Sequence, residues 1–333
     1  SFSRNDKIHL INFNFPGWIR MRFNGRRIEL SPYQTITLGL AAIILIGAVV
    51  LSLPFSSATG HSIGFLNALF TATSAVTVTG LGVLDTGTDF SLFGQSFILL
   101  LIQIGGLGFT TFGVIIAIIL GKKIGLKQRL FISISTGQHN LQGLVRLVLT
   151  ILTMTVAFEL IGFIVLTLRW IGEMGWSKAT YYSLFHTVAA FNNSGFSLWS
   201  DSLTGYVSDP VVNIVITALV ILGSIGFIVI TDVWNKRNWR QLSLHSKIVL
   251  ITTGALLSFG FLFFLVVEWG NAKTMGPLSI GSRLWSAWFQ AVTGRTTGFN
   301  TLDIAGMYGA SQFVLILLMF IGGSSGSAAG GIK

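Results

Sequence analysis

The sequence predicts an all-α polytopic membrane protein in which tandem re-entrant repeats surround one pore. Three observations predict it: the composition, the length of the apolar runs, and a glycine-centred motif that occurs three times. Of the 333 residues, 52% are hydrophobic and 10% are charged, against about 25% charged in soluble domains. Apolar runs lie near 35–53, 93–120, 147–168, 210–231 and 248–267, and a sixth begins near 311. Each of the first five can cross the hydrocarbon core, which takes about 20 residues.

The charges indicate orientation in a membrane and not a nucleic-acid partner. Fifteen of the 21 Lys and Arg residues fall in the segments 1–34, 121–146 and 234–247 if residues 1–34 are cytoplasmic and each long run crosses once. This asymmetry follows the positive-inside rule. We therefore expect a multi-pass protein of the cell membrane, in contact with the lipid bilayer, with its N-terminus in the cytoplasm. The chain has no Cys, and its first 34 residues lack the apolar core of a removable signal peptide.

A motif recurs around Gly80, Gly195 and Gly298, in the stretches "TVTGLGV", "NNSGFSL" and "RTTGFNT". Each copy follows a short segment, 63–76, 178–190 or 281–293, that is too short and polar to cross a bilayer and is expected to be an amphipathic helix. A second glycine cluster follows each copy, at 103–109, 221–227 and 320–326. The repeating unit is therefore a span, a short helix, a glycine-centred loop and a second span, and the loops are expected to line a shared cavity.

These loops suit a dehydrated monovalent cation. Backbone carbonyls and Ser or Thr hydroxyls supply the several oxygen ligands that such an ion needs, and glycine reaches the backbone angles that aim carbonyls at one axis. The short helices would also direct their partially negative C-terminal ends toward the ion. Close packing of small residues is the alternative role for each glycine, and the regular spacing favours the ion pathway. The candidate filter residues are Thr77, Val78, Thr79, Gly80, Asn192, Asn193, Ser194, Gly195, Thr296, Thr297 and Gly298, with potassium at their carbonyls.

The end of the chain predicts an unwound loop at mid-membrane depth. Only nine apolar residues, 313–321, precede "GGSSGSAAGG", and at 1.5 Å per residue they reach roughly half the bilayer. A run this poor in helix formers should not stay helical. An ordinary loop or close packing is the alternative to a gate. The candidate gate residues are Gly322, Gly323, Ser324, Ser325, Gly326, Ser327, Ala328, Ala329, Gly330, Gly331 and Lys333.

The three filter motifs, with "QIGGLGF" and the terminal "GGSSGSAAGGIK", resemble the Trk/Ktr/HKT superfamily of potassium transporters and, within it, KtrB-type membrane subunits. The resemblance covers residues 31–333. It implies four non-identical M1-P-M2 repeats, similar to those of potassium channels, around one pore, with Gly80, Gly195 and Gly298 as filter glycines and an intramembrane gating loop at the small-residue run. It also implies a homodimer on a cytosolic nucleotide-binding ring of the RCK type. On the observed spacing, a fourth filter glycine is expected near 401–413, beyond Lys333.

This reading divides the chain into six segments. They are a basic cytosolic segment (1–34), repeat A (35–120), a cytosolic loop (121–146), repeat B (147–233), a second cytosolic loop (234–247) and repeat C (248–333), whose second span is cut at the gating loop. Repeat D is absent from the chain.

The expected function is potassium uptake gated by a regulatory subunit that docks on the two basic loops. The sequence leaves open whether sodium stimulates transport or permeates, and no covalent cofactor is expected. A secondary transporter of another small solute with glycine-broken helices is the alternative, although these repeats run in parallel and not in inverted order. An enzyme is not expected, because clustered catalytic groups are missing from the spans, and a non-conducting scaffold would leave the re-entrant loops unexplained.

Three side chains need separate expectations. Glu159 lies within an apolar span, where an ionised group is costly, so it is either functional or held by a hydrogen bond to a neighbouring helix. Arg295 supports the filter in our reading and is expected to point behind it, toward a carboxylate such as Asp303 or Glu268. His186 is expected to be a packing residue, since no second ligand stands at metal-binding spacing.

Overall fold

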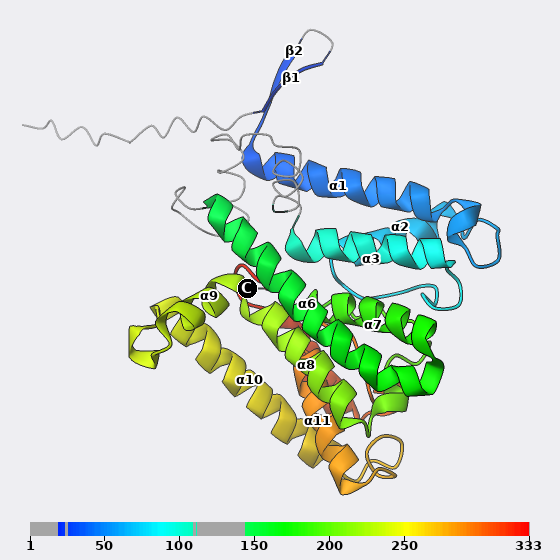
Figure 1. Cartoon of the computed structure of the whole chain (residues 1–333), viewed down its shortest axis with the longest axis vertical. Helices are drawn as coiled ribbons and strands as arrows, with labels where there is room; N and C mark the ends of the chain where they lie inside the picture. Colours follow the sequence, from blue (N-terminus) through cyan, green and yellow to red (C-terminus); the bar gives the residue numbers. More distant parts are fainter. Residues whose placement is uncertain (1–18, 24–25, 109–110, 112–143, 333) are drawn as a thin grey trace, which may run out of the picture.

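A computed structural model describes residues 19–23, 26–108, 111 and 144–332 (Figure 1). Residues 121–143 of the predicted cytosolic loop 121–146 lie outside the described residues, as does the predicted gate residue Lys333. The chain begins with a two-stranded antiparallel hairpin, β1 (Ile19–Phe23) and β2 (Arg26–Leu30), with Ile19 opposite Leu30. This hairpin is the one departure from the all-α expectation among the described residues, and it precedes the first membrane helix.

Repeat A contains helix α1 (Pro32–Leu51), a short 3-10 turn η1 (Pro54–Ser56), the short helix α2 (Phe65–Val76) and helix α3 (Leu92–Leu107). A capping box starts α1: the Ser31 hydroxyl accepts from the Gln34 amide, and the Gln34 side chain accepts from the Ser31 amide. Helix α3 ends at Gly108, whose φ of 80° favours glycine.

Repeats B and C contain the same three main helices in the same order, a long helix, a short helix and a second apolar helix. Repeat B has α6 (Leu144–Met174), α7 (Trp176–Phe191), η2 (Thr204–Tyr206), α8 (Pro210–Ile225) and α9 (Phe227–Lys236). The predicted loop 234–247 contains η3 (Trp239–Gln241), and repeat C has α10 (Leu244–Glu268), which begins within that loop, α11 (Ile280–Thr293), η4 (Ile304–Gly306) and α12 (Gly309–Phe320). The three predicted short helices are confirmed as α2, α7 and α11.

The sequence predicts one continuous span at 210–231, but the structure has two helices there, α8 and α9. Helices α8 and α9 meet at Gly226 with a bend of 95°. Gly226 has a φ of 96°, which lies outside the region that other residues adopt readily. As a result α9 leaves the direction of α8, as the yellow-green helices labelled α8 and α9 in Figure 1 show.

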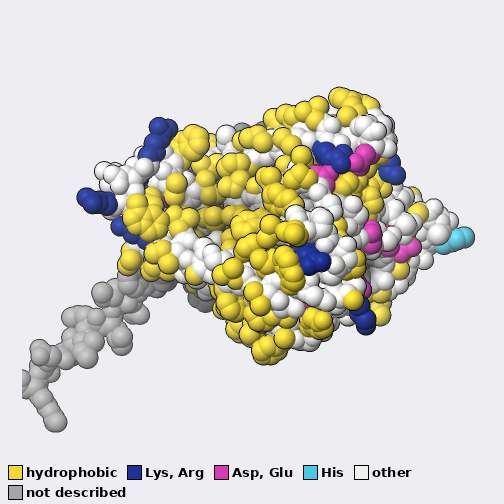
Figure 2. Space-filling model, turned by 90° about the horizontal axis from the view of Figure 1, so that it is seen from below, with side chains coloured by type: hydrophobic (Ala, Val, Ile, Leu, Met, Phe, Trp, Pro, Cys, Tyr) yellow, Lys and Arg dark blue, Asp and Glu magenta, His cyan; other side chains and the backbone are white. Residues whose placement is uncertain are grey.

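The outer surface of the described part suits a bilayer. Helices α1, α6 and α10 are each long and apolar enough to cross a membrane, and the bent pair α8 and α9 would count as a fourth span. Large apolar side chains such as Ile46, Leu160 and Val266 are exposed along the long helices. Figure 2 shows hydrophobic side chains over the middle of one face and charged side chains mostly toward its two ends.

The core lies around the short helices, which are the most enclosed elements of each repeat. Helix α7 carries Phe185 and Phe191, both fully buried, and α11 carries Phe289. The three repeats follow one another in space, because α3 packs against α7 and α8 packs against α11. Burial of the short helices between long apolar ones places the three glycine-centred loops together inside the protein.

Candidate ion pathway

The three loops share an unusual backbone. The central glycines have positive φ values, 78° at Gly80, 69° at Gly195 and 91° at Gly298. The residue two positions earlier also has positive φ in every copy: Val78 (56°), Asn193 (57°) and Thr296 (65°). A left-handed conformation costs an ordinary residue about 1–2 kcal/mol, so its recurrence at equivalent positions marks a functional backbone. Alternation of the sign of φ turns neighbouring carbonyls to the same side, which is the arrangement that a ring of carbonyl ligands needs.

The loop amides point back to the helices that precede them. The amide of Thr79 donates to the Ser74 carbonyl at 2.8 Å, and that of Ser194 donates to Ala189 at 2.9 Å. In the third loop the amide of Thr297 donates to the Thr293 carbonyl at 3.1 Å. These bonds satisfy carbonyls at the helix ends that would otherwise lack partners. They also leave the loop carbonyls free to face away from the helices.

The filter glycines bring the loops into direct contact. A Cβ atom on Gly80 would lie 2.1 Å from the Ser194 carbonyl oxygen, and one on Gly195 would lie 2.1 Å from that of Thr297. A Cβ on Gly298 would be 3.9 Å from the Thr79 carbonyl oxygen. Each of the first two loops therefore abuts the next loop along the chain, and the carbonyls of all three converge. No side chain larger than hydrogen fits at Gly80 or Gly195.

The side chains of the loops point mainly to protein acceptors. The Thr297 hydroxyl donates to the Asn193 side chain at 2.9 Å, which links loops C and B, and Asn193 Nδ2 donates to the Val220 carbonyl on α8. The Ser194 hydroxyl donates to the Ala189 carbonyl, and that of Thr77 lies 2.6 Å from the Thr79 hydroxyl. We expected these hydroxyls to contribute as ligands. Their hydrogen bonds indicate that they hold the loops in shape, so the backbone carbonyls are the groups left for an ion.

The small-residue run after α12 is unwound, as the sequence predicted. Helix α12 ends at Phe320, and the loop of residues 322–331, here called the gate loop, is closed by bonds from the Gly322 amide to the Ile332 carbonyl and from the Gly323 amide to the Gly330 carbonyl. The loop packs on the break between α8 and α9. The amides of Ser324 and Ala328 donate to the last carbonyls of α8, and the Gly326 carbonyl accepts from the first amide of α9, each at 3.0–3.1 Å.

The gate loop and the helix break therefore satisfy each other. A helix end leaves backbone carbonyls and amides without partners, and within a membrane such groups are costly unless protein covers them. The gate loop covers both ends of the break at Gly226. A cavity of about 240 Å³ separates the gate loop from the first filter loop, and its walls include Val76, Thr77, Val78, Gly105, Gly106, Thr111, Gly326 and Ala328. The first glycine-centred loop and the loop of residues 322–331 thus face a common space.

Arg295 contacts no carboxylate among the residues that the structure describes, and the expected pairing with Asp303 or Glu268 is wrong. Its side chain is buried, and Nη2 donates to the Gly322 carbonyl at 3.2 Å. Glu268 accepts instead from Asn271, Thr274 and the Tyr308 amide, and Asp303 caps the turn at Ala305. Arg295 nevertheless lies behind the third filter loop and connects it to the gate loop.

His186 is a fully buried packing residue. Its Nδ1 lies 2.8 Å from the Tyr182 carbonyl, and its Nε2 accepts from the Leu198 amide at 3.3 Å. The ring packs against Trp199, with 4.5 Å between the ring centroids, and stacks on Phe299 at 6.1 Å.

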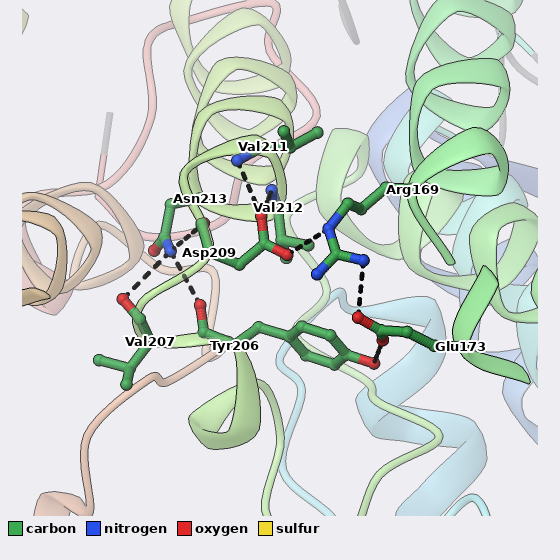
Figure 3. Close-up of polar contacts among 8 residues, drawn as sticks. All are labelled: Arg169, Glu173, Tyr206, Val207, Asp209, Val211, Val212 and Asn213. Carbon is green, nitrogen blue, oxygen red and sulfur yellow. Dashed lines mark hydrogen bonds and ion pairs between the residues drawn. The ribbon is translucent and has the colours of Figure 1, made fainter. Parts of the chain in front are cut away.

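Sequence reasoning missed a polar network between the C-terminal end of α6 and the N-terminal end of α8 (Figure 3). The Arg169 guanidinium pairs with Glu173 and with Asp209, each at 2.6 Å, and Glu173 accepts from the Tyr206 hydroxyl at 3.1 Å. Burial and the bond to Glu173 raise the pKa of Tyr206 above its ordinary value, so the phenol stays protonated and continues to donate.

Asp209 also caps α8 by accepting from the Val211 and Val212 amides. The Asp-Pro step at 209–210 was the available signal, because it is typical of a helix start.

Helices that re-enter the membrane and aim carbonyl-lined loops at one centre define a channel-like cation pathway in a polytopic membrane protein. The chain belongs to the TrkH cation transport protein family, whose model matches residues 31–333. It is 47% identical over 306 residues to Ktr system potassium uptake protein B of Bacillus subtilis (strain 168), covering 92% of this chain and 68% of that protein. It is 40% identical over 307 residues to the potassium/sodium uptake protein NtpJ of Enterococcus hirae, with coverage of 92% and 68%.

The fold also matches a solved structure. The crystal structure of the potassium transporter TrkH from Vibrio parahaemolyticus aligns with a TM-score of 0.63 at 18% identity, over 90% of this chain and 58% of that one. The chain therefore spans about two thirds of the length of these curated relatives and less of the solved protein.

Proposed function

We propose that the full-length protein carries potassium into the cell through the three filter loops, with the gate loop controlling the passage. The observation that carries this proposal is the convergence of the loops: alternate residues have positive φ, and the glycines of two loops abut the carbonyl oxygen of the next. Such carbonyls can replace the hydration shell of a monovalent cation. The relatives with potassium uptake in their names support the same ion for this chain.

The arrangement also supports a fourth M1-P-M2 unit beside repeat A. In loop A the side chains of Thr77 and Thr79 are exposed, whereas Asn192 and Ser194 in loop B are fully buried between neighbouring repeats. A groove of about 590 Å³ runs along α2 and loop A and is lined by residues that include Leu66, Phe70, Thr73, Thr79, Leu81 and Val83. A fourth unit in this groove would complete a ring of four loops, as the resemblance implies.

Regulation in this proposal comes from the cytoplasmic side. Four basic residues are exposed or half-buried near the C-terminal end of α9, the helix that the gate loop contacts: Lys236 in α9, Arg237 and Arg240 after it, and Lys247 in the first turn of α10. A cytosolic nucleotide-binding ring that docks there, under a homodimer of membrane subunits, could move α9 and with it the gate loop. Orientation with the N-terminus in the cytoplasm of a cell-membrane protein follows from the same charge distribution.

The non-identical loops suggest weaker selectivity than four equal ones would give. The residue two positions before the filter glycine is Val78 in one loop, Asn193 in the next and Thr296 in the third, so the carbonyls do not have equivalent neighbours. The name of the Enterococcus hirae relative includes sodium as well as potassium. Sodium is therefore the competing ion that the test must include.

The test is rubidium and potassium flux into proteoliposomes that contain the full-length protein, with and without competing sodium. The informative variant is Gly298→Ser, because its φ of 91° is strained for any side chain. Gly281→Ser is the matched control, since it lies in the same repeat, in α11, with no atom within 4 Å of an added Cβ. Potassium flux that Gly298→Ser alone abolishes or opens to sodium supports the proposal. Flux that is indifferent to Gly298 would refute it.

A further inference from the structure

The polar network behind the second filter loop begins at Glu159, in the middle of the long helix α6. Its Oε1 accepts from Asn192 Nδ2 at 3.3 Å, and its Oε2 accepts from Gln103 Nε2 at 3.4 Å. Gln103 belongs to α3 of repeat A, and Asn192 is the residue that ends α7 and enters loop B. Three elements from two repeats therefore meet at one carboxylate in the membrane interior.

Asn192 is the most constrained member of this network. Its side chain is fully buried, and its Nδ2 donates to Gln103 Oε1 at 2.7 Å and to the Val188 carbonyl at 2.9 Å as well as to Glu159. An amide nitrogen has two hydrogens, so the three acceptors share them. The amide cannot turn over without presenting its oxygen to the oxygens of Gln103 and Glu159. The acceptors thus fix one orientation of the side chain.

The other side of Asn192 is fixed by shape. A Cβ atom on Gly106 would lie 1.9 Å from Asn192 Oδ1, so the amide fits against α3 only because that position is glycine. Asn192 is followed directly by Asn193, with its positive φ, and then by Ser194 and Gly195. A shift of the Asn192 side chain would therefore move the start of the carbonyl-bearing segment.

The equivalent position in the other two repeats has a different partner in each. It is Thr77 in loop A, which bonds within its own loop, and Arg295 in loop C, which bonds to the gate loop. Among the described residues, loop B is the only one of the three loops whose side chain at this position bonds to a carboxylate on a membrane-spanning helix. An acidic group in such a span is costly, and the contacts to Gln103 and Asn192 give a reason for its presence.

We propose that Glu159 is a positioning residue for ion selection: it holds Asn192, and through it the backbone of the second filter loop, in the geometry that distinguishes potassium from sodium. The proposal rests on the proposed potassium pathway and assigns to Glu159 a role at that same site. The required property is a hydrogen-bond acceptor at this place, and a negative charge is not required. A glutamine in its place keeps the acceptor for the Asn192 amide and loses only the acceptor for Gln103 Nε2, whose bond to Glu159 is the longer of the two.

The experiment measures the ratio of potassium to sodium flux in proteoliposomes of the full-length protein and its variants Glu159→Gln and Glu159→Leu. Thr155→Val is the matched control, because Thr155 is buried one turn away on α6 and its hydroxyl has no hydrogen-bond partner among the described residues. Both fluxes are measured on the same vesicles, so the amount of folded protein cancels. A role limited to helix packing would change the yield and leave the ratio unchanged.

We expect Glu159→Leu to lower the ratio by up to about tenfold, because the Asn192 amide loses one of the acceptors that orient it and a hydrogen bond contributes about 0.5–1.5 kcal/mol net. Glu159→Gln and Thr155→Val should stay near the wild-type ratio. If Glu159→Leu does not fold, Gln103→Leu removes an acceptor from the same amide and should lower the ratio in the same direction. An unchanged ratio in the leucine variants, or an equal loss in Glu159→Gln, would overturn the proposal. Absence of potassium flux in the wild type would instead refute the proposed function.

Discussion

Arg295 Nη2 lies 3.2 Å from the carbonyl oxygen of Gly322 and so joins the third filter loop to the first residue of the gate loop. The arginine is 5% exposed, so solvent screens this contact little. Gly322 closely follows the C-terminal end of α12, where a cation is favoured by the helix dipole. A change in the position of the gate loop must therefore break or replace this bond, and the filter and the gate are mechanically connected through one side chain.

Replacement of Arg295 by Met should raise potassium flux measured without any regulator. The bond to Gly322 stabilises the gate loop in its docked position, and a hydrogen bond to a charged group contributes about 1.5–3 kcal/mol, so its loss shifts the population toward the undocked loop. The matched control is Arg283→Met, because Arg283 also donates to backbone carbonyls, those of Gly276 and Leu278, but at the other end of α11. Equal basal flux in Arg295→Met and the wild type would contradict this connection.

Gly226→Ala should release the gate loop from the helix break. The added Cβ would lie 2.6 Å from Ser324 Oγ and 3.0 Å from the Ser325 carbonyl oxygen, and the φ of 96° disfavours alanine. We expect higher basal flux and a lower unfolding temperature, measured in the same preparation. Gly254→Ala is the control, since it lies within α10 with no atom within 4 Å of an added Cβ. A Gly226→Ala protein with normal stability and normal basal flux would show that the loop does not depend on the break.

The short helices could be predicted from the sequence because their signals are local. Residues 281–293 were expected and Ile280–Thr293 is observed, with Ser279 accepting from the Ser282 amide at the helix start. The repeated motif likewise predicted the positions of Gly80, Gly195 and Gly298, since glycine at a positive φ leaves a direct trace in the sequence. Local rules of this kind do not require knowledge of the rest of the fold.

The connections between distant segments could not be predicted in the same way. The bend at Gly226 depends on the gate loop, which supplies backbone partners from about a hundred residues further along the chain. Arg295 was expected to pair with a carboxylate, but its partner is a backbone carbonyl, and every residue has one. Gln103 was overlooked, although a polar residue in an apolar span is a usable signal. Its partner Asn192 is 89 residues away and is identified only by the packing of α3 against α7.

Gly80→Ala and Gly195→Ala should each abolish potassium flux. In both, the new Cβ would lie 2.1 Å from a backbone carbonyl oxygen of the next loop, and backbone cannot rotate away as a side chain can. The positive φ adds about 1–2 kcal/mol of strain. Flux per folded protein is the measurement, and Gly172→Ala in α6, with no atom within 4 Å of its added Cβ, is the control. Wild-type flux in Gly195→Ala would mean that loops B and C do not meet as described.

Asp209 has two separable roles at the N-terminal end of α8, as Figure 3 shows. Its Oδ1 caps the helix by accepting from the Val211 and Val212 amides at 2.9 and 3.1 Å, and its Oδ2 pairs with Arg169 Nε at 2.6 Å. Asparagine is as good a cap as aspartate, so Asp209→Asn removes the ion pair and keeps the cap. Asp209→Ala removes both. Arg169 retains Glu173 as a partner in either variant.

The two variants should therefore differ in stability by about 1 kcal/mol, the usual contribution of a helix cap. The ion pair should contribute no more than about 1 kcal/mol, because the Arg169 side chain is 33% exposed and solvent screens it. Thermal unfolding at low and high salt separates the two roles. The difference between wild type and Asp209→Asn should shrink as salt rises, since screening weakens exposed ion pairs, whereas the difference between Asp209→Asn and Asp209→Ala should stay constant. Equal stability of Asp209→Asn and Asp209→Ala would show that the helix cap does not stabilise the protein. A loss of stability in Asp209→Asn that does not depend on salt would show that the ion pair is not its cause.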